Sequence, residues 1–451
     1  MLVRAISQRL LLLLGLAISL TTGQLSPQPE QVHLSVTNDP TQMVVTWVTQ
    51  SPTNSTSVDY GTNRFDRSAS GVQEKFVDGG SAKRVIYIHR AVMSGLRPGQ
   101  RYVYRVGSEL GWSDVFLFTA TKSGSDWPAR FAVYGDMGNT NGKSIPFLQK
   151  EAQSGDFDMV LHVGDFAYNM DTNNALVGDE FMRQVEPIAA YVPYMTCPGN
   201  HESAYNFSNY RRRFSMPGGD GEGSFFSFDY GPVHVISFSS EFYYYLDYGW
   251  KQAVYQFQWL EEDLQRANQN RANRPWIIAM AHRPMYCSNS DDPQHCTNAD
   301  NLIRTGFPVG SKQRSRIFGS DYILGVEQLF YRYGVDLIFG AHEHSYERMW
   351  PVYNQKVCNS TTSSDNPYDN PPAPVHVITG SAGCVEGEDP FIPAGLPWSA
   401  FRSDDYGYTR MTVANATHLM LEQVSVDKGG QVIDSIVYVR NKHGSSAFNC
   451  V

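Results

Sequence analysis

The sequence has little cysteine, no excess of basic residues and a single long hydrophobic run, and each shortage excludes a class of protein. Six cysteines in 451 residues, with no CxxC pair, exclude a small disulfide-held fold and a zinc ribbon. With 36 basic and 45 acidic residues the net charge is −9, which argues against binding to nucleic acid or to an acidic membrane surface. A globular protein of about two or three domains, stabilised by its hydrophobic core, fits these limits.

The one hydrophobic run lies at the N-terminus, from Leu10 to Leu20, after the basic residues Arg4 and Arg9. Small residues follow it up to Gly23, so residues 1–23 are predicted to be a cleaved signal peptide. The run is about half the length of ~20 apolar residues that a membrane span needs. We therefore expect no membrane span, and a protein that is secreted or kept in the lumen of an acidic compartment of the secretory pathway.

Glycosylation sequons and the cysteines are consistent with export. Asn-x-Ser/Thr occurs at Asn54, Asn206, Asn359 and Asn415. Cysteines of an exported protein are expected to form disulfides, and the nearest neighbours are Cys287 with Cys296 and Cys358 with Cys384. These pairs would leave Cys450 free or paired between chains, and the sequence does not specify an oligomeric state.

Residues 27–122 have the pattern of an all-β domain. Short stretches rich in β-branched and aromatic residues are separated by turn formers such as Asn38-Asp39-Pro40, without a helical period. The expected strands are Met43–Thr49, Ser57–Gly61, Val85–Met93, Arg101–Gly107 and Val115–Thr121. About seven short strands in this length predict a β-sandwich that serves as a scaffold.

The pattern changes near residue 128, where apolar strands begin to alternate with amphipathic helices. The expected strands are Phe131–Gly135, Met159–Gly164, Tyr194–Gly199, Val233–Ser239, Trp276–Ala281, Val335–Ala341 and Val375–Gly380. Helices are expected around Val254–Leu264 and over Val326–Tyr333, the second ending at Gly334. This alternation predicts an α/β domain with buried sheets over residues 128–350, completed by strands in residues 372–440.

Five of these strands end in side chains that can bind a metal ion. The side chains are Asp136, Asp165 with Tyr168, Asn200 with His201, His282, and His342 with His344. Because ligands of α/β sheets bind beyond the carboxyl ends of the strands, we expect these residues to meet at one edge. Any one of them alone has an ordinary structural explanation, such as a helix cap or a core histidine, but their conjunction predicts a metal site.

The number of donors indicates two metal ions. Seven side chains with oxygen or nitrogen donors are too many for one ion and suit two ions that share a bridging carboxylate. Carboxylate, imidazole and phenolate donors suit iron, zinc or manganese, and the phenolate of Tyr168 favours a hard trivalent ion.

The five blocks resemble those of the metallophosphoesterases and, specifically, the purple acid phosphatases, whose pattern is GDxG, GDxxY, GNH[DE], a lone His and GHxH. Large members of that family also carry an N-terminal fibronectin III-like sandwich, so the resemblance covers nearly the whole mature chain, with a catalytic domain of mixed sheets flanked by helices. It implies that Asp136, Tyr168 and His344 hold Fe³⁺, that Asn200, His282 and His342 hold a divalent ion, and that Asp165 bridges them. Ala341 departs from the pattern, because the family has glycine there.

The resemblance implies an acid phosphatase that hydrolyses phosphate monoesters by attack of a metal-bound hydroxide on phosphorus. The divalent ion is expected to be zinc, iron or manganese, and a trivalent partner would permit activity in acid. His201 is expected to contact phosphate and assist the leaving group. His295 is a second candidate, because a Cys287–Cys296 disulfide would turn it towards the substrate.

Other functions fit the same residues. A phosphodiesterase or pyrophosphatase would share every ligand and differ in the loops at residues 205–222 and 287–319, whereas a non-catalytic binding protein is at odds with the complete ligand set. Glu202 and Glu343 are interpreted as supports of neighbouring ligands or as solvated side chains. For Arg283 and Arg348 both a phosphate contact and an ordinary ion pair remain open.

Overall fold

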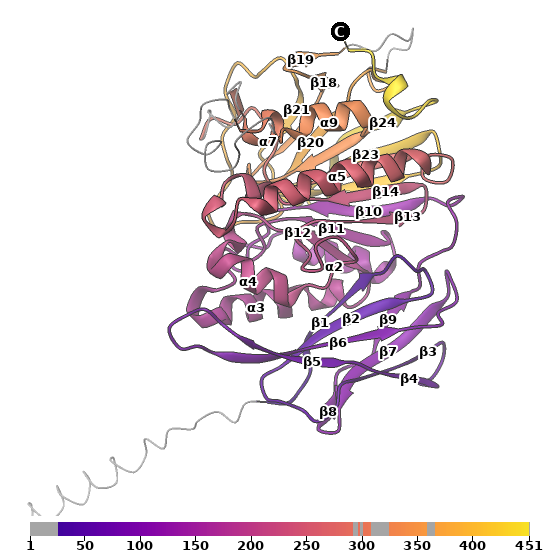
Figure 1. Cartoon of the computed structure of the whole chain (residues 1–451), viewed down its shortest axis with the longest axis vertical. Coiled ribbons are helices and arrows are strands. Elements are labelled where there is room, and N and C mark those ends of the chain that lie inside the picture. The colour runs from indigo at the N-terminus through magenta and orange to yellow at the C-terminus, as the bar shows by residue number, and fades with distance from the viewer. Residues whose placement is uncertain (1–25, 292–295, 298–300, 308–323, 359–365, 451) are drawn as a thin grey trace, which may run out of the picture.

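A computed structural model describes residues 26–291, 296–297, 301–307, 324–358 and 366–450 of the protein. In Figure 1 an all-β domain lies below a larger α/β domain, and the chain passes from the first to the second. The predicted signal peptide, His295 and Asn359 lie outside the described residues. Within the residues described, no helix is long and apolar enough to cross a membrane.

The N-terminal domain is a sandwich of two antiparallel sheets, as predicted. One sheet has the strand order β1-β2-β6-β5, and the other has the order β4-β3-β7-β8, with β9 also paired to β7. The strands are β1 (Glu30–Val36), β2 (Met43–Thr49), β3 (Ser57–Gly61), β4 (Arg67–Ser70), β5 (Val72–Val77), β6 (Val85–Met93), β7 (Arg101–Ser108), β8 (Gly111–Trp112) and β9 (Phe116–Thr119). Trp47, Tyr102 and Tyr104 are buried in its core.

The α/β domain contains two mixed sheets. The six-stranded sheet has the order β12-β11-β10-β22-β23-β24, and the seven-stranded sheet has the order β13-β14-β15-β16-β20-β17-β21. The first comprises β10 (Ala129–Tyr134), β11 (Met159–Val163), β12 (Tyr194–Cys197), β22 (Gly407–Val413), β23 (His418–Ser425) and β24 (Gln431–Val439). The second comprises β13 (Phe226–Tyr230), β14 (Val233–Ser237), β15 (Trp276–Met280), β16 (Leu337–Gly340), β17 (Tyr346–Met349), β20 (Val375–Thr379) and β21 (Ser399–Ser403).

The centre of each sheet is parallel, and antiparallel strands complete both sheets. Strands β10, β11 and β12 are parallel, as are β14, β15, β16 and β20. A small ribbon of β18 (Val352–Tyr353) and β19 (Lys356–Val357) lies apart from them. Val133 and Leu161 of one sheet share a hydrophobic cluster with Ile278 and Phe339 of the other, so the sheets pack on a common core.

Helices cover the sheets, and the two helices predicted from the sequence are confirmed. The α-helices are α2 (Ile145–Ser154), α3 (Thr172–Ala189), α4 (Ala204–Arg213), α5 (Lys251–Gln269), α7 (Leu302–Thr305) and α9 (Val326–Tyr333). Short 3₁₀ helices are η1 (Asn200–Glu202), η2 (Ser240–Tyr243), η3 (Leu246–Tyr248) and η4 (Ser445–Ala447). Helix α5 buries Val254, Leu260 and Leu264, and α9 ends at Gly334 with a φ of 65°, a conformation that glycine adopts without strain.

The disulfides are partly as predicted. Cys287 is bonded to Cys296, but Cys358 is bonded to Cys450 rather than to Cys384. Pairing Cys358 with its nearest cysteine in the sequence was wrong, because the C-terminal segment folds back and brings Cys450, 92 residues later, to Cys358. Cys384 is instead a buried free thiol, and Cys450 is neither free nor available to another chain.

The two sheets are joined where their parallel strands end. The backbone N–H of Gly135, just after β10, donates to the carbonyl of Thr379 at the end of β20 over 2.8 Å. The Thr379 hydroxyl donates in turn to the carbonyl of Val133 over 3.0 Å. These bonds bring the carboxyl ends of both sets of parallel strands to one seam.

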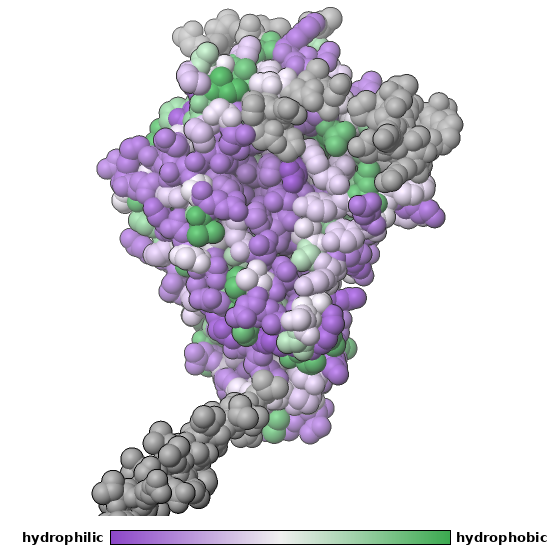
Figure 2. All heavy atoms as spheres, turned by 90° about the vertical axis from the view of Figure 1, so that its left-hand side faces the viewer, coloured by the Kyte–Doolittle hydropathy of each residue, from purple (hydrophilic) through white to green (hydrophobic). Residues whose placement is uncertain are grey.

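The face of the molecule in Figure 2 is mainly hydrophilic. Among the described residues on this face, the hydrophobic ones form only small, separate patches.

Candidate metal centre

The seven predicted ligands lie at the seam between the two sheets. Asp136 follows β10, Asp165 and Tyr168 follow β11, and Asn200 follows β12, all in the six-stranded sheet. His282 follows β15, and His342 and His344 follow β16, in the seven-stranded sheet. The structure therefore brings together residues that lie up to 208 positions apart, from Asp136 to His344.

The backbone turns sharply at four of these residues. Asp136, Asp165, Tyr168 and His342 have φ values of 55°, 51°, 51° and 72°. Non-glycine residues in this left-handed region are uncommon, and such strain gathers at functional sites. Here the turns aim the side chains across the seam, and the surrounding packed strands maintain them.

Ala341, the departure from the family pattern, fits because its neighbour is a glycine. A Cβ atom on Gly135 would lie 2.5 Å from the Cβ of Ala341, so the alanine methyl occupies space that Gly135 leaves empty. Ala341 itself does not have a positive φ, and it is the next residue, His342, that does. An alanine at this position therefore does not add backbone strain.

Three predicted ligands form one group of donors. The hydroxyl of Tyr168 lies 3.1 Å from Oδ1 of Asp136 and 2.9 Å from Nε2 of His344. Nε2 of His344 lies 3.6 Å from the same Asp136 oxygen. These are the three residues to which the family resemblance assigned the ferric ion.

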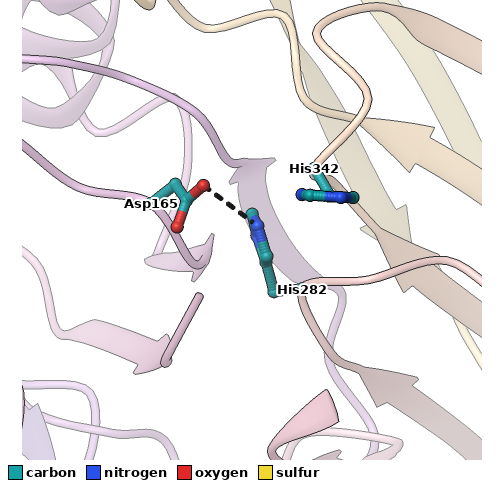
Figure 3. Close-up of side chains that lie close together, drawn as sticks. All are labelled: Asp165, His282 and His342. Atoms are coloured by element: carbon teal, nitrogen blue, oxygen red, sulfur yellow. Dashed lines mark ion pairs between the residues drawn. The ribbon is translucent and has the colours of Figure 1, made fainter. Parts of the chain in front are cut away.

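The remaining four form a second group. Nε2 of His282 lies 3.1 Å from Oδ1 of Asn200 and 3.1 Å from Oδ2 of Asp165. One donor atom of each of Asp165, His282 and His342 lies within 4.8 Å of the others. Figure 3 shows these three side chains close together. The backbone N–H of His342 donates to Asp136, which links the second group to the first.

In two of the histidines, a hydrogen bond from Nδ1–H orients the ring so that Nε2 can bind a metal ion. Nδ1–H of His282 donates to the carbonyl of Val163 over 2.9 Å, and Nδ1–H of His344 donates to the carbonyl of Gly387 over 3.0 Å. Both rings therefore direct Nε2 into the site, which is how metal-binding histidines are usually fixed.

The charges at the site fit bound cations. Burial raises the pKa of Asp136 to about 7, against the charges of His282 and His344. Burial lowers the pKa of His282, but the carboxylate of Asp165 outweighs it and raises this pKa to about 10. The buried carboxylates therefore need positive charge close to them. Protons on the imidazoles supply that charge here, and metal ions with oxygen and nitrogen ligands would supply it equally well.

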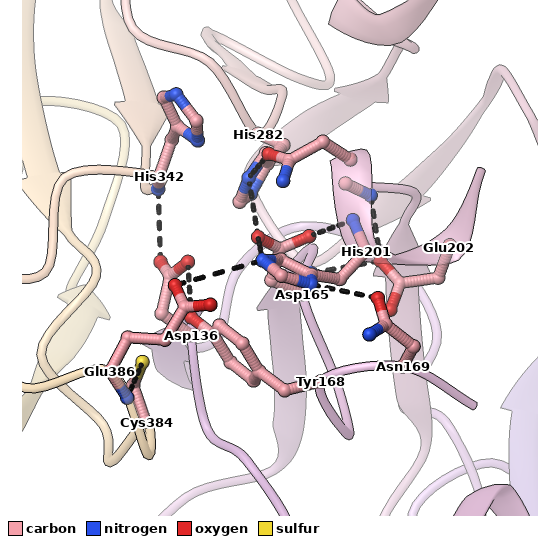
Figure 4. Close-up of polar contacts among 12 residues, drawn as sticks. Asp136, Asp165, Tyr168, Asn169, His201, Glu202, His282, His342, Cys384 and Glu386 are labelled. Atoms are coloured by element: carbon pink, nitrogen blue, oxygen red, sulfur yellow. Dashed lines mark hydrogen bonds and ion pairs between the residues drawn. The ribbon is translucent and has the colours of Figure 1, made fainter. Parts of the chain in front are cut away.

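Two further residues support the ligands, and Figure 4 shows both. Glu202 is buried and accepts the backbone N–H groups of Asp165, Phe166 and Gly199, so it holds two ligand-bearing turns together. Asn169 accepts Nδ1–H of His201 over 2.8 Å. The role of Asn169 was not predicted, although its position directly after Tyr168 was the available signal.

His201 lies at the mouth of the site. Its Nε2 is 3.9 Å from Oδ2 of Asp165 and 3.8 Å from Oε2 of Glu386, and its ring packs on Tyr168 with centroids 4.3 Å apart. Its side chain is 19% exposed, so the ring retains contact with solvent. Cys384 contacts one of the first group of donors, with its sulfur 3.4 Å from Nδ1 of His344.

The two arginines differ in position. Arg283 is paired with Glu241, and one of its guanidinium nitrogens lies 2.8 Å from Nε2 of His342. A guanidinium only donates and a neutral imidazole has one lone pair, so a metal ion on His342 would displace this contact. Arg348 is paired with Asp434 and is a structural residue away from the ligands.

The other expected site residues have mixed outcomes. Glu343 is buried, which rules out the solvated interpretation. Asn54 and Asn415 are exposed, and Asn206 is half-buried.

Three family models match consecutive parts of the chain. Residues 29–120 match the purple acid phosphatase N-terminal domain, residues 129–346 match the calcineurin-like phosphoesterase, and residues 373–435 match the iron/zinc purple acid phosphatase-like protein C.

Named relatives are similar over most of the chain. Acid phosphatase type 7 of Homo sapiens is 52% identical over 438 residues, 96% of each chain. The protein of the same name from Mus musculus is 53% identical over 415 residues, 91% of each chain. A solved purple acid phosphatase from seeds of yellow lupin, Lupinus luteus, is 25% identical with a TM-score of 0.74, over 92% of this chain and 75% of its own.

Proposed function

The chain belongs to the purple acid phosphatase family and is an acid phosphatase of a kind that has a dinuclear metal centre; from this premise we propose how the site works. We assign one ion to Asp136, Tyr168 and His344, the second to Asn200, His282 and His342, and the bridge to Asp165. The observation that supports this assignment is the grouping of the donors, because the Tyr168 hydroxyl contacts Asp136 and His344, and His282 contacts Asn200 and Asp165.

We propose that the first ion is Fe³⁺ and the second is divalent zinc, iron or manganese. A phenolate such as that of Tyr168 is a donor that suits a hard trivalent ion. When bound, the ions supply positive charge for the phosphate oxygens and make a coordinated water acidic enough to attack phosphorus at low pH.

The residues of the chain position the substrate and its protons. His201 presents Nε2 to the phosphate or to the leaving oxygen, because Asn169 occupies Nδ1. Glu202 keeps the turns that carry Asp165 and Asn200 in place, through backbone bonds of 2.9 to 3.0 Å. General acid–base assistance of this kind contributes about 10²–10⁴-fold to a rate. His295 is proposed as a second substrate contact, held by the adjoining disulfide of Cys296.

Counting metals in the purified protein tests the assignment. We expect about two ions per chain, one of them iron, and a visible absorption band from the ferric phenolate that is lost in Tyr168→Phe. Zinc or manganese alone, without the band, would refute the ferric assignment. A folded protein without metal would refute the site.

We propose that the substrates are phosphate monoesters. The family implies phosphate esters, and the test is hydrolysis of a monoester and a matched diester at the same acidic pH. Faster cleavage of the diester or of pyrophosphate would favour the alternative activity on the same ligands.

We propose that the protein is exported to the cell exterior or to an acidic lumen. Support comes from the sequence of residues 1–23, from two disulfides, and from exposed sequons at Asn54 and Asn415. Mass spectrometry of protein from the culture medium of an expressing cell would check the cleaved N-terminus and the glycans. An intact, cell-retained chain without glycans would contradict export.

A further inference from the structure

One loop of the N-terminal sandwich contacts the two helices that follow the turns of the metal site. The loop covers residues 78–84, between β5 and β6, and is called the sandwich loop below. Helix α3 begins three residues after Asn169, and α4 begins three residues after His201. In Figure 1 both helices lie at the boundary with the sandwich. The sandwich loop is therefore close to both partners of the Asn169–His201 hydrogen bond.

The first contact of the loop is with the N-terminal turn of α3. The backbone N–H of Ala82 donates to Oδ1 of Asn174 over 2.9 Å. A Cβ atom on Gly80 would lie 2.7 Å from the same oxygen, so this close approach requires a glycine. The start of α3 is bonded in turn to the site, because the N–H of Thr172 donates to the carbonyl of Asn169 over 3.1 Å.

The second contact is with α4. The buried carboxylate of Asp78 accepts Nδ2–H of Asn209 over 3.1 Å. The ring of Tyr205 lies against Gly79, where a Cβ atom would be only 2.1 Å from the ring. Tyr205 lies in the first turn of α4, shortly after His201. A shift of this turn would therefore move the imidazole of His201.

Buried charges join the two helices to each other and to the sandwich. Asp179 of α3 is fully buried and pairs with Arg84 of the sandwich loop and, over 2.8 Å, with Arg213 of α4. Arg213 also donates to Asn209 over 3.1 Å and to Gln31 of β1 over 3.0 Å. Separating these elements would leave unpaired charges in the interior, which is costly, so their relative position is well defined.

Both helices begin with backbone that needs support from outside the helix. Residues 173–175 have φ values of 54°, 55° and 65°, and residues 205–207 have φ values of 53°, 58° and 58°. Runs of non-glycine residues in this left-handed region are costly and persist only where the surrounding structure holds them. The sandwich loop contacts both runs, through Asn174 and Tyr205.

We propose that the sandwich loop positions the Asn169–His201 pair, with Asp78 and Asn174 as its positioning residues. The loop holds the first turns of α3 and α4 at a fixed separation and so keeps the amide oxygen of Asn169 within hydrogen-bond distance of His201. The N-terminal domain is then part of the catalytic apparatus as well as a scaffold. This inference rests on the role proposed for His201 and adds the element that maintains it.

A double-mutant cycle tests this role with a phosphate monoester, and metal content is measured alongside. We expect Asn174→Ala to lower kcat about three- to tenfold, a fraction of the roughly 10²–10⁴-fold that acid–base assistance provides. In the His201→Ala background the same substitution should change kcat less than about twofold, because residues that act through one another are not additive. Asn174→Asp keeps an acceptor oxygen for Ala82 and should restore most of the wild-type rate.

Hydrogen exchange of the metal-loaded, substrate-free protein tests the same role without turnover. In Asn174→Ala and in Asp78→Ala we expect several-fold faster exchange in peptides that cover residues 169–175 and 200–209, because their support is lost. Exchange over residues 282–286, which follow β15 in the other sheet, should be unchanged.

Two features of the variants separate positioning from loss of structure. Asp59→Ala removes a carboxylate that pairs with Arg105 in the other sheet of the sandwich, and it should leave kcat and the exchange of both peptides unchanged. Asn174 is half-buried and Asp78 is buried, so the Asn174 variant keeps the test valid if Asp78→Ala does not fold.

The outcomes distinguish this inference from the proposed function. An equal loss of kcat for Asn174→Ala in the wild-type and His201→Ala backgrounds, no loss in either, or unchanged exchange in both peptides would overturn the positioning role. If the metal-loaded wild type hydrolyses no phosphate monoester, the proposed function fails, and the exchange experiment still decides whether the sandwich loop holds the two turns.

Discussion

The amide oxygen of Asn169 lies 2.8 Å from Nδ1 of His201 and fixes the orientation of that ring. Asn169 directly follows the predicted ligand Tyr168, and His201 directly follows the predicted ligand Asn200. Asn169 belongs to the turn after β11, and His201 belongs to η1, after β12. The bond between them ties two neighbouring strand ends and engages Nδ1, so Nε2 is the His201 nitrogen that we propose for the substrate contact.

Replacing Asn169 with leucine should misorient His201. We expect kcat for a monoester to fall roughly tenfold, a fraction of the roughly 10²–10⁴-fold that acid–base assistance provides. Asn169→Asp keeps an acceptor oxygen and should retain most of the rate. Steady-state kinetics with metal content measured alongside makes the comparison, and equal rates in both variants and the wild type would exclude this orienting role.

Replacing Asp165 with alanine should weaken the binding of both metal ions. As the proposed bridge, its carboxylate serves both ions, so we expect metal content to fall from about two ions per chain to below one and activity to fall about 10³-fold or more. Asp59→Ala, which removes a carboxylate of the β-sandwich that pairs with Arg105, should leave both unchanged. Full metal content in the Asp165 variant would refute the bridging assignment.

His234 should make stability depend on pH far from the metal site. Burial lowers its pKa, but hydrogen bonds and charges from Asp229 and Asp263 outweigh burial and raise the pKa to about 9 from 6.5. Because the folded pKa is above the unfolded one, this stabilisation is fully present below pH 6.5 and is lost as pH rises to about 9. We expect His234→Asn to lower the unfolding free energy by about 2–3 kcal/mol at pH 6 and by much less above pH 9.

Denaturant unfolding at several pH values between 5 and 10 measures this difference. A second buried histidine provides the control, because burial lowers the pKa of His33 to about 4 and the ring stays neutral throughout that range. Because the unfolded ring has its ordinary pKa of 6.5, the cost of His33→Gln should be constant above about pH 7 and should decrease below it, the opposite direction to His234. A cost for His234→Asn that does not decrease towards pH 9 would contradict the charge assigned to His234.

The Cys358–Cys450 disulfide should stabilise the protein and leave two free thiols. It closes a loop of 92 residues, for which the loss of unfolded-state entropy is worth about 4–5 kcal/mol as an upper figure. We expect Cys450→Ser to lower the Tm by several degrees. In the denatured, unreduced wild type, thiol titration should find Cys197 and Cys384, and peptide mapping should join Cys358 to Cys450. A Cys358–Cys384 peptide would contradict the pairing.

The strands and the residues at their ends were predictable because both leave a local signal. Apolar runs such as those of β11 and β15 predict buried strands, and Asp165 and His282 follow shortly after the ends of those runs. The seam that unites them could be inferred from a general rule of α/β sheets.

Contacts that depend on tertiary packing could not be predicted. The partner of Cys358 is set by how the C-terminal segment folds back, and sequence spacing carries no information about that path. The support from Glu202 depends on three backbone N–H groups that converge only once the turns after β11 and β12 exist. The accommodation of Ala341 depends equally on a close approach to Gly135.

The division of the ligands between the two sheets has a consequence for the order of events during synthesis. Each proposed donor group draws on the six-stranded sheet and also on the turn after β16, through His342 or His344. The ribosome releases Asp136, Asp165 and Asn200 long before these histidines, and domains generally form as they emerge. Neither ion can therefore find its complete set of side chains on a nascent chain that stops before residue 342, so metal loading must follow translation of the turn after β16.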